Sequence, residues 1–187
     1  RHISANLAAI LADGLPPKAV GEDHSGNAGA QNHQFEPDFT PGQVFQHEIG
    51  HLALSRFSRS STPVWVAEGG AMQLAGEQRR ASWRQGLTSG EFEEMTFLRL
   101  ARRDPSMGLS GMEYAYVNAA VSSLVDEFGA ERFWEFYRDF KEFTDPSAGN
   151  PLEQVHADAT NRLLFRIYDI GEEQLDERAL EWMRAAT

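Results

Sequence analysis

The chain has 187 residues, of which 41% are hydrophobic, and its formal net charge is −11. This length fits one domain, and the 12 Phe and 4 Trp residues supply bulk for a core. The negative charge excludes nucleic acid and anionic membranes as main partners. Because the chain has no cysteine, it has no disulfides and no thiol catalysis, and any metal site must use His, Asp and Glu.

The sequence also bears on the compartment. No stretch approaches the roughly 18 uncharged apolar residues that a membrane span needs, so we expect no span in this chain. The chain starts at Arg1 rather than Met, which fits a processed form or an excised domain. We favour an exported or cell-envelope bacterial protein over a cytoplasmic one. The oligomeric state is left open.

The first 40 residues contain the most loop-like part of the chain. A short helix is predicted at 4–13, and the stretch 14–30 is rich in Gly, Pro, Asn and Asp, as loops are. A short extended segment is predicted at about 31–35. Any sheet is therefore expected here, and it would be small.

Helical patterns begin at Thr40-Pro41, a good helix start with Thr40 as the N-cap. Phe45, Ile49 and Leu52 then fall at i, i+4 and i+7, which gives this helix one apolar face. Further helices are predicted at 64–78, 91–102, 114–128, 130–143, 152–169 and 172–185. Gly171 is predicted to cap the C-terminus of the helix at 152–169.

Residues 47–51 read His-Glu-Ile-Gly-His. On a helix, His47 and His51 lie one turn apart on one face, so both imidazoles can reach one metal ion. Glu48 lies about 100° further round the helix, where it can act as a general base on a water at that ion. Two surface histidines on one helix by coincidence are the alternative.

A catalytic zinc needs three protein ligands, and Glu68 supplies a candidate for the third. It lies in the second turn of the helix that starts after Pro63, and the chain between is long enough to bring this helix back across the first. Gly69 and Gly70 follow, and each costs about 1 kcal/mol in a helix interior. We therefore expect another backbone or a substrate to pass close by. An ordinary solvated carboxylate is the alternative for Glu68.

These motifs resemble the gluzincin zinc metallopeptidases, specifically the small peptidase MA-like family, over about residues 28–185. That family has a His-Glu-x-x-His helix and a Trp-x-Ala-Glu-Gly helix, as at Trp65–Gly69 here. Its later, less specific segments are matched by Tyr114-Ala115, Val121, Leu124, Phe128-Gly129, the run 168–175 and Trp182.

By this resemblance, Tyr114 aligns with a tyrosine that donates a hydrogen bond to the oxyanion, and Tyr116 is its rival. Two departures are clear. Related enzymes carry an Asp four residues after the glutamate ligand, where this chain has Met72, so the group that orients the histidine must come from elsewhere or be weak. The segment 28–35 lacks the acid with which aminopeptidases hold a free amine, which favours an endopeptidase.

We therefore predict a single zincin-like α+β domain, mostly helical, with a small N-terminal sheet. Its zinc-helix lobe would cover about 1–89 and its helical lobe about 90–187. The expected activity is zinc-dependent hydrolysis of a peptide or protein substrate. Glu48 would be the general base, and Tyr114 would stabilise the oxyanion. A non-catalytic domain that keeps the fold and binds a peptide or partner protein is the alternative, and a purely structural helical domain would leave the ligand-type residues unexplained.

Overall fold

A computed structural model describes residues 40–57, 62–102, 107–140 and 152–187, and these residues form helices only. The predicted α+β class is therefore wrong, because the described part contains no strand and no sheet. Its segments repeat their apolar residues with a helical period, and none alternates as a half-buried strand would. The predicted segments at 4–13 and 31–35 lie outside the described residues.

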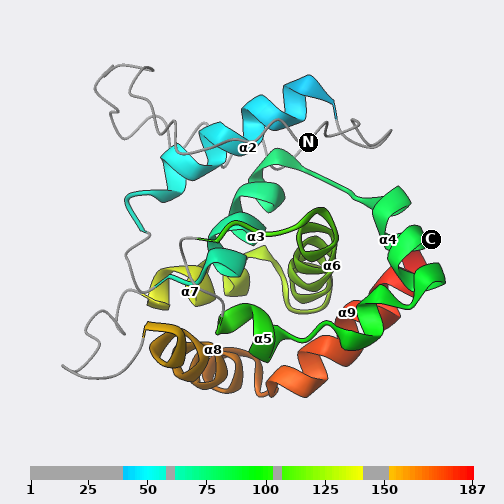
Figure 1. Cartoon of the computed structure of the whole chain (residues 1–187). Helices are drawn as coiled ribbons and strands as arrows, with labels where there is room; N and C mark the ends of the chain where they lie inside the picture. The colour runs from blue at the N-terminus through cyan, green and yellow to red at the C-terminus, as the bar shows by residue number, and fades with distance from the viewer. Residues whose placement is uncertain (1–39, 58–61, 103–106, 141–151) are drawn as a thin grey trace.

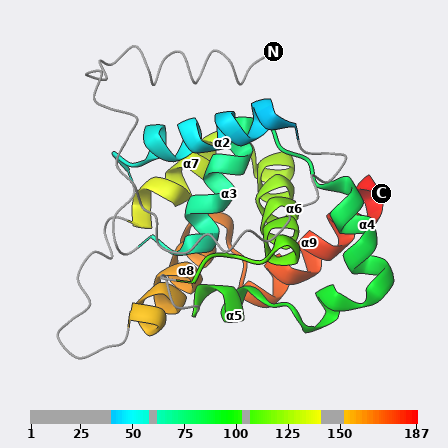
Figure 2. The same ribbon diagram turned by 45° about the horizontal axis from the view of Figure 1, so that its top comes forward.

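The helices follow one another with short connections. Their bounds are α2 (Pro41–Leu54), α3 (Val64–Ala75), α4 (Arg80–Ser89), the 3₁₀ turn η1 (Glu91–Glu94), α5 (Phe97–Ala101), α6 (Gly111–Phe128), α7 (Ala130–Asp139), α8 (Leu152–Tyr168) and α9 (Glu172–Ala186). In Figure 1, α3 and α6 lie in the middle, and α7, α8, α5, α9 and α4 surround them. The helix α2 lies at the periphery and packs mainly on α3, as Figures 1 and 2 both show. None of the described helices is long and apolar enough to cross a membrane.

The start of α2 is as predicted. Thr40 is the N-cap and its side chain accepts a hydrogen bond from the backbone N–H of Gln43, while the Gln43 side chain accepts one from the Thr40 backbone. This reciprocal pair satisfies two otherwise unpaired donors at the helix start. The predicted apolar face is only partly covered, since Phe45 is 65% and Leu52 61% exposed. The opposite face, with Leu54, is the one that packs on α3.

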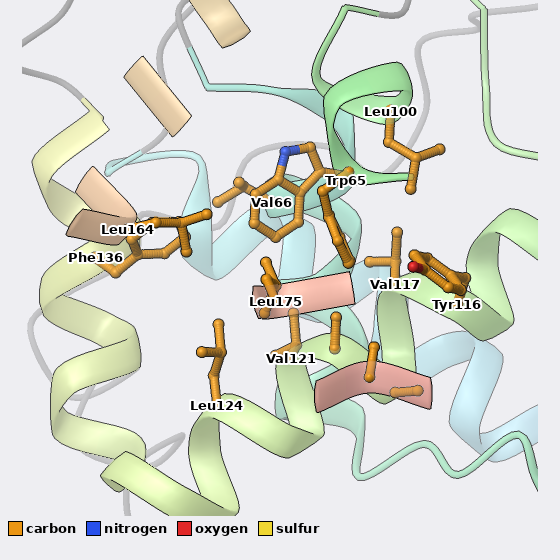
Figure 3. Close-up of a cluster of buried hydrophobic side chains, with 14 of the residues drawn as sticks. Trp65, Val66, Leu100, Tyr116, Val117, Val121, Leu124, Phe136, Leu164 and Leu175 are labelled. Carbon is orange, nitrogen blue, oxygen red and sulfur yellow. The ribbon is translucent and has the colours of Figure 1, made fainter. Parts of the chain in front are cut away.

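One core runs through the described helices. Trp65 of α3 contacts Phe97 of α5 and Phe136 of α7, with ring centroids 5.0 and 5.9 Å apart. Val117 and Val121 of α6 face the same space (Figure 3). This core contains residues from both sides of position 90, where the division into two lobes was predicted, and that division stays a prediction.

Several helix boundaries differ from expectation. The segment predicted as one helix at 91–102 forms the 3₁₀ turn η1 and the separate short helix α5. The second helix ends at Ala75 rather than at residue 78, because Gly76 takes the left-handed conformation, with φ of 65°. Gly171 caps no C-terminus: it precedes α9, where its N–H donates to the Gln174 side chain. The left-handed residue that follows α8 is Asp169, with φ of 58°.

Candidate metal centre

The two histidines of α2 face α3 because the two helices approach closely at Gly50. A Cβ at this position would lie 3.1 Å from the Cα and 3.2 Å from the carbonyl oxygen of Ala71. Any larger residue would push α3 away. Gly50 thus permits the close contact that brings Glu68 of α3 to His47 and His51.

The three donor groups converge on one point. His47 Nε2 lies 3.0 Å from Glu68 Oε2 and 3.0 Å from His51 Nε2, and His51 Nε2 lies 3.3 Å from Glu68 Oε2. The side chain of His51 is 31% exposed and that of Glu68 is 17% exposed, while that of His47 is 9% exposed. The cluster is therefore sheltered on one side and reaches solvent on the other.

This geometry fits zinc. Zinc holds imidazole nitrogen and carboxylate oxygen at about 2.0–2.2 Å, so tetrahedral ligand atoms lie about 3.3 Å from each other. The observed separations of 3.0 to 3.3 Å are close to that value. Two neutral imidazoles and one carboxylate are also a donor set that catalytic zinc uses, with a fourth position left for water or substrate. Among the described residues, these three form the group that could hold a metal ion.

A residue that the sequence did not point to, Glu77, orients the first candidate ligand, His47. Its Oε1 lies 2.7 Å from His47 Nδ1, and its side chain is fully buried. A bond from the Nδ1–H to this carboxylate fixes the ring orientation and directs Nε2 toward Glu68 and His51. Glu77 therefore does what was expected from the position of Met72, but from nine residues beyond Glu68 rather than four.

The C-terminus of α3 explains how Glu77 reaches His47. The Gly76 N–H donates to the carbonyl of Gln73, and the Glu77 N–H donates to the carbonyl of Met72. This pair of bonds is a Schellman motif, which requires the left-handed Gly76 and turns the chain back on the helix. Asn118 of α6 then holds the Glu77 carbonyl at 3.2 Å through its side-chain amide.

The carboxylates shift the titration of the cluster. Burial lowers the pKa of His47, but hydrogen bonds and attraction from Glu68 and Glu77 outweigh it and raise that pKa from 6.5 to about 9. For Glu68, burial raises the pKa, but His47 and His51 outweigh it and lower it from 4.5 to about 2. In the metal-free protein at neutral pH, His47 thus carries a proton that a metal ion would have to displace.

Tyr114 and Tyr116, the two candidates for oxyanion stabilisation, lie in different places. The Tyr114 ring centroid is 6.4 Å from that of His47. Burial raises the Tyr114 pKa, and the charge of Glu68 and a hydrogen bond to it raise it further, so the phenol stays protonated at neutral pH. Tyr116 is buried in the core (Figure 3), and its hydroxyl donates to Asp176 at 2.6 Å. Only Tyr114 is thus brought to the metal-ligand cluster.

Glu48 is exposed and lies beside His47 on the solvent side of α2. Its charge is among the causes that raise the pKa of Tyr114, after burial and Glu68. The role of Glu48 as general base stays a prediction from its place next to His47.

The glycines after Glu68 serve helix packing rather than the close approach of a backbone or substrate. A Cβ at Gly69 would lie 2.5 Å from Val121 Cγ2 of α6, and one at Gly70 would lie 2.8 Å from Tyr137 Cε2 of α7. The neighbours are side chains of the core. The two glycines therefore let α6 and α7 pack tightly behind the helix that carries Glu68.

Comparison of the chain with protein-family models, with curated proteins and with solved structures found no match. The case for a function consequently rests on the site itself.

Proposed function

We propose that this protein binds one zinc ion through His47, His51 and Glu68 and hydrolyses peptide bonds, as a peptidase of the gluzincin type. The observation that carries the proposal is the convergence of the three donor atoms within 3.0 to 3.3 Å of one another. The bond from His47 to the buried Glu77 supports it, since metal-ligating histidines commonly donate their second N–H to a carboxylate.

The chain's own residues have distinct roles in the proposed reaction. Bound zinc would polarise the scissile carbonyl and lower the pKa of water, so that the water gives up a proton readily and attacks as hydroxide. Glu48 accepts the proton of the attacking water and returns it to the leaving amine. Tyr114 donates its hydroxyl proton in a hydrogen bond to the oxyanion that develops on the carbonyl. Glu77 keeps His47 in one orientation throughout.

The test measures zinc content and hydrolysis separately. The wild-type protein should hold about one zinc per chain, and His47→Ala or Glu68→Ala should remove most of it. Glu48→Gln should keep the zinc and the fold while losing hydrolysis of a library of N-acetylated, C-amidated peptides. Full zinc content in both ligand variants would refute the metal site.

The library also separates endopeptidase from aminopeptidase activity, because its members offer no free amine. Cleavage of these blocked peptides is the expected result for an endopeptidase. Cleavage of free-amine versions alone would instead identify an aminopeptidase. Zinc binding with no cleavage of either kind would favour a non-catalytic domain that binds a peptide or a partner protein.

A further inference from the structure

The turn between α3 and α4 carries a second charged residue, Arg79, at a position that touches two parts of the site. Its Nη2 donates to Glu77 Oε2 at 3.1 Å, and its Cζ lies 5.1 Å from the centroid of the Tyr114 ring. Only 12% of the side chain is exposed. The guanidinium is therefore held between the carboxylate that orients His47 and the phenol beside Glu68.

We propose that Arg79 is a positioning residue, which fixes Glu77 and Tyr114 with one guanidinium and so sets the orientation of His47. This inference rests on the proposed zinc site. Arg79 is not a metal ligand, and it acts on the site through its two neighbours.

The effect of Arg79 on Glu77 follows from the burial of the Glu77 side chain. Glu77 uses one oxygen for His47 and the other for Arg79, and its side chain is fully buried. A buried carboxylate that loses a charged partner pays a large desolvation penalty, and it responds by moving or by taking up a proton. Either response weakens its bond to His47 Nδ1. The histidine would then lose its fixed tautomer and ring orientation.

The effect of Arg79 on Tyr114 follows from the shape and charge of the guanidinium. A planar cation over an aromatic face is attracted by the ring, and arginine makes this contact better than lysine because its plane can stack. The charge of Arg79 also opposes the rise of the Tyr114 pKa, which agrees with their closeness. Arg79→Lys would keep the charge but lose the planar fork that reaches both neighbours.

The experiment measures zinc affinity by competition with a chromogenic chelator, so it does not depend on turnover. Arg79→Met should weaken zinc binding about tenfold, at the low end of the range for outer-shell residues. Glu77→Gln should weaken it by at least as much, and the double variant no more than Glu77→Gln alone.

The visible spectrum of the Co²⁺-substituted protein should change in Arg79→Met, since it reports the ligand geometry directly. Arg80→Met is the matched control, because Arg80 is the next residue, is exposed and donates from its Nε to the Gln78 side chain.

The outcomes separate this inference from the proposed function. Zinc affinity and a Co²⁺ spectrum equal to wild type in Arg79→Met would overturn the role of Arg79 while leaving the zinc site intact. Fully additive losses in the double variant would also overturn it, since Arg79 would then not act through Glu77. A wild-type protein without zinc affinity would instead refute the proposed function. If Arg79→Met does not fold, Arg79→Lys decides: the proposal requires a several-fold loss of affinity in this variant, and wild-type affinity would contradict it.

Discussion

At the scale of single residues, the two neighbouring tyrosines show how one helix divides its side chains between a site and a core. Tyr114 and Tyr116 are two positions apart on α6, so they point about 200° apart round the helix. The first lies beside His47, and the second stacks on Phe97 with ring centroids 5.1 Å apart. Their substitutions should therefore have different consequences.

Tyr114→Phe should lower the rate of hydrolysis about 10²–10³-fold with little change in KM, because one oxyanion donor is lost. Zinc content and unfolding should stay near wild type. Tyr116→Phe should leave turnover per folded molecule unchanged but lower the free energy of unfolding by about 1–2 kcal/mol, since Asp176 loses a partly buried hydrogen bond. Steady-state kinetics and urea unfolding of both variants test this pair. The reverse pattern would move the catalytic role to Tyr116.

At the scale of helices, the candidate site depends on how closely α2 and α3 pack. The helix start at Thr40 and the i, i+4 spacing of His47 and His51 are local features, so the sequence alone predicts them. The approach of Glu68 depends on a long-range contact at Gly50. The sequence indicated it only through the need for a third ligand, a connection long enough to reverse the chain, and the family resemblance. The place of Glu77 depends on a Schellman turn at Gly76. A helix that continues through that glycine to residue 78, as predicted, does not turn Glu77 back to His47, which is why this carboxylate was not predicted.

The error in fold class comes from a part of the prediction that had little support in the sequence. The helical periods of the described segments are visible in the sequence, and the helices at 114–128 and 152–169 match α6 and α8 within a few residues. The predicted sheet had no clear alternating pattern behind it. It followed from a weak extended segment at 31–35 and from the family that the chain resembles.

Gly50→Ala should test the helix contact without touching a ligand. Alanine normally favours a helix interior, but its Cβ would meet the backbone of Ala71 at 3.1 Å and force α3 outward. We expect about a tenfold loss of zinc affinity, because a site must be held within about 0.5 Å to keep its geometry. Gly42→Ala is the control on the same helix, since its nearest contact would be Thr40 Oγ1 at 3.9 Å. Chelator competition should show wild-type affinity for this control, and equal affinity in both variants would contradict the argument.

At the scale of the whole molecule, the candidate metal site links folding to pH differently in the metal-free and the metal-loaded protein. In the metal-free protein, the pKa of His47 is raised from 6.5 to about 9 by its carboxylate partners. A raised pKa stabilises the fold fully below pH 6.5, and this contribution is lost as the pH rises through about 9. The pKa of Glu68 is lowered to about 2, so its contribution is present above pH 4.5 and is lost as the pH falls through about 2.

The metal-free protein should therefore be most stable between about pH 4.5 and 6.5, and its free energy of unfolding should fall by the order of 2 kcal/mol by pH 9.5. The zinc-loaded protein at a fixed free zinc concentration should instead keep a nearly constant stability over about pH 7.5–9, because the tighter zinc binding that follows loss of the His47 proton offsets the lost metal-free contribution. Urea unfolding of chelator-treated and zinc-buffered samples at pH 5.5, 7.5 and 9.5 would measure both.

Glu77→Gln removes one of the causes that raise the His47 pKa, so its metal-free stability should depend less on pH above 6.5. A metal-free wild type with flat stability from pH 6.5 to 9.5 would show that His47 does not carry the proton that this geometry assigns to it.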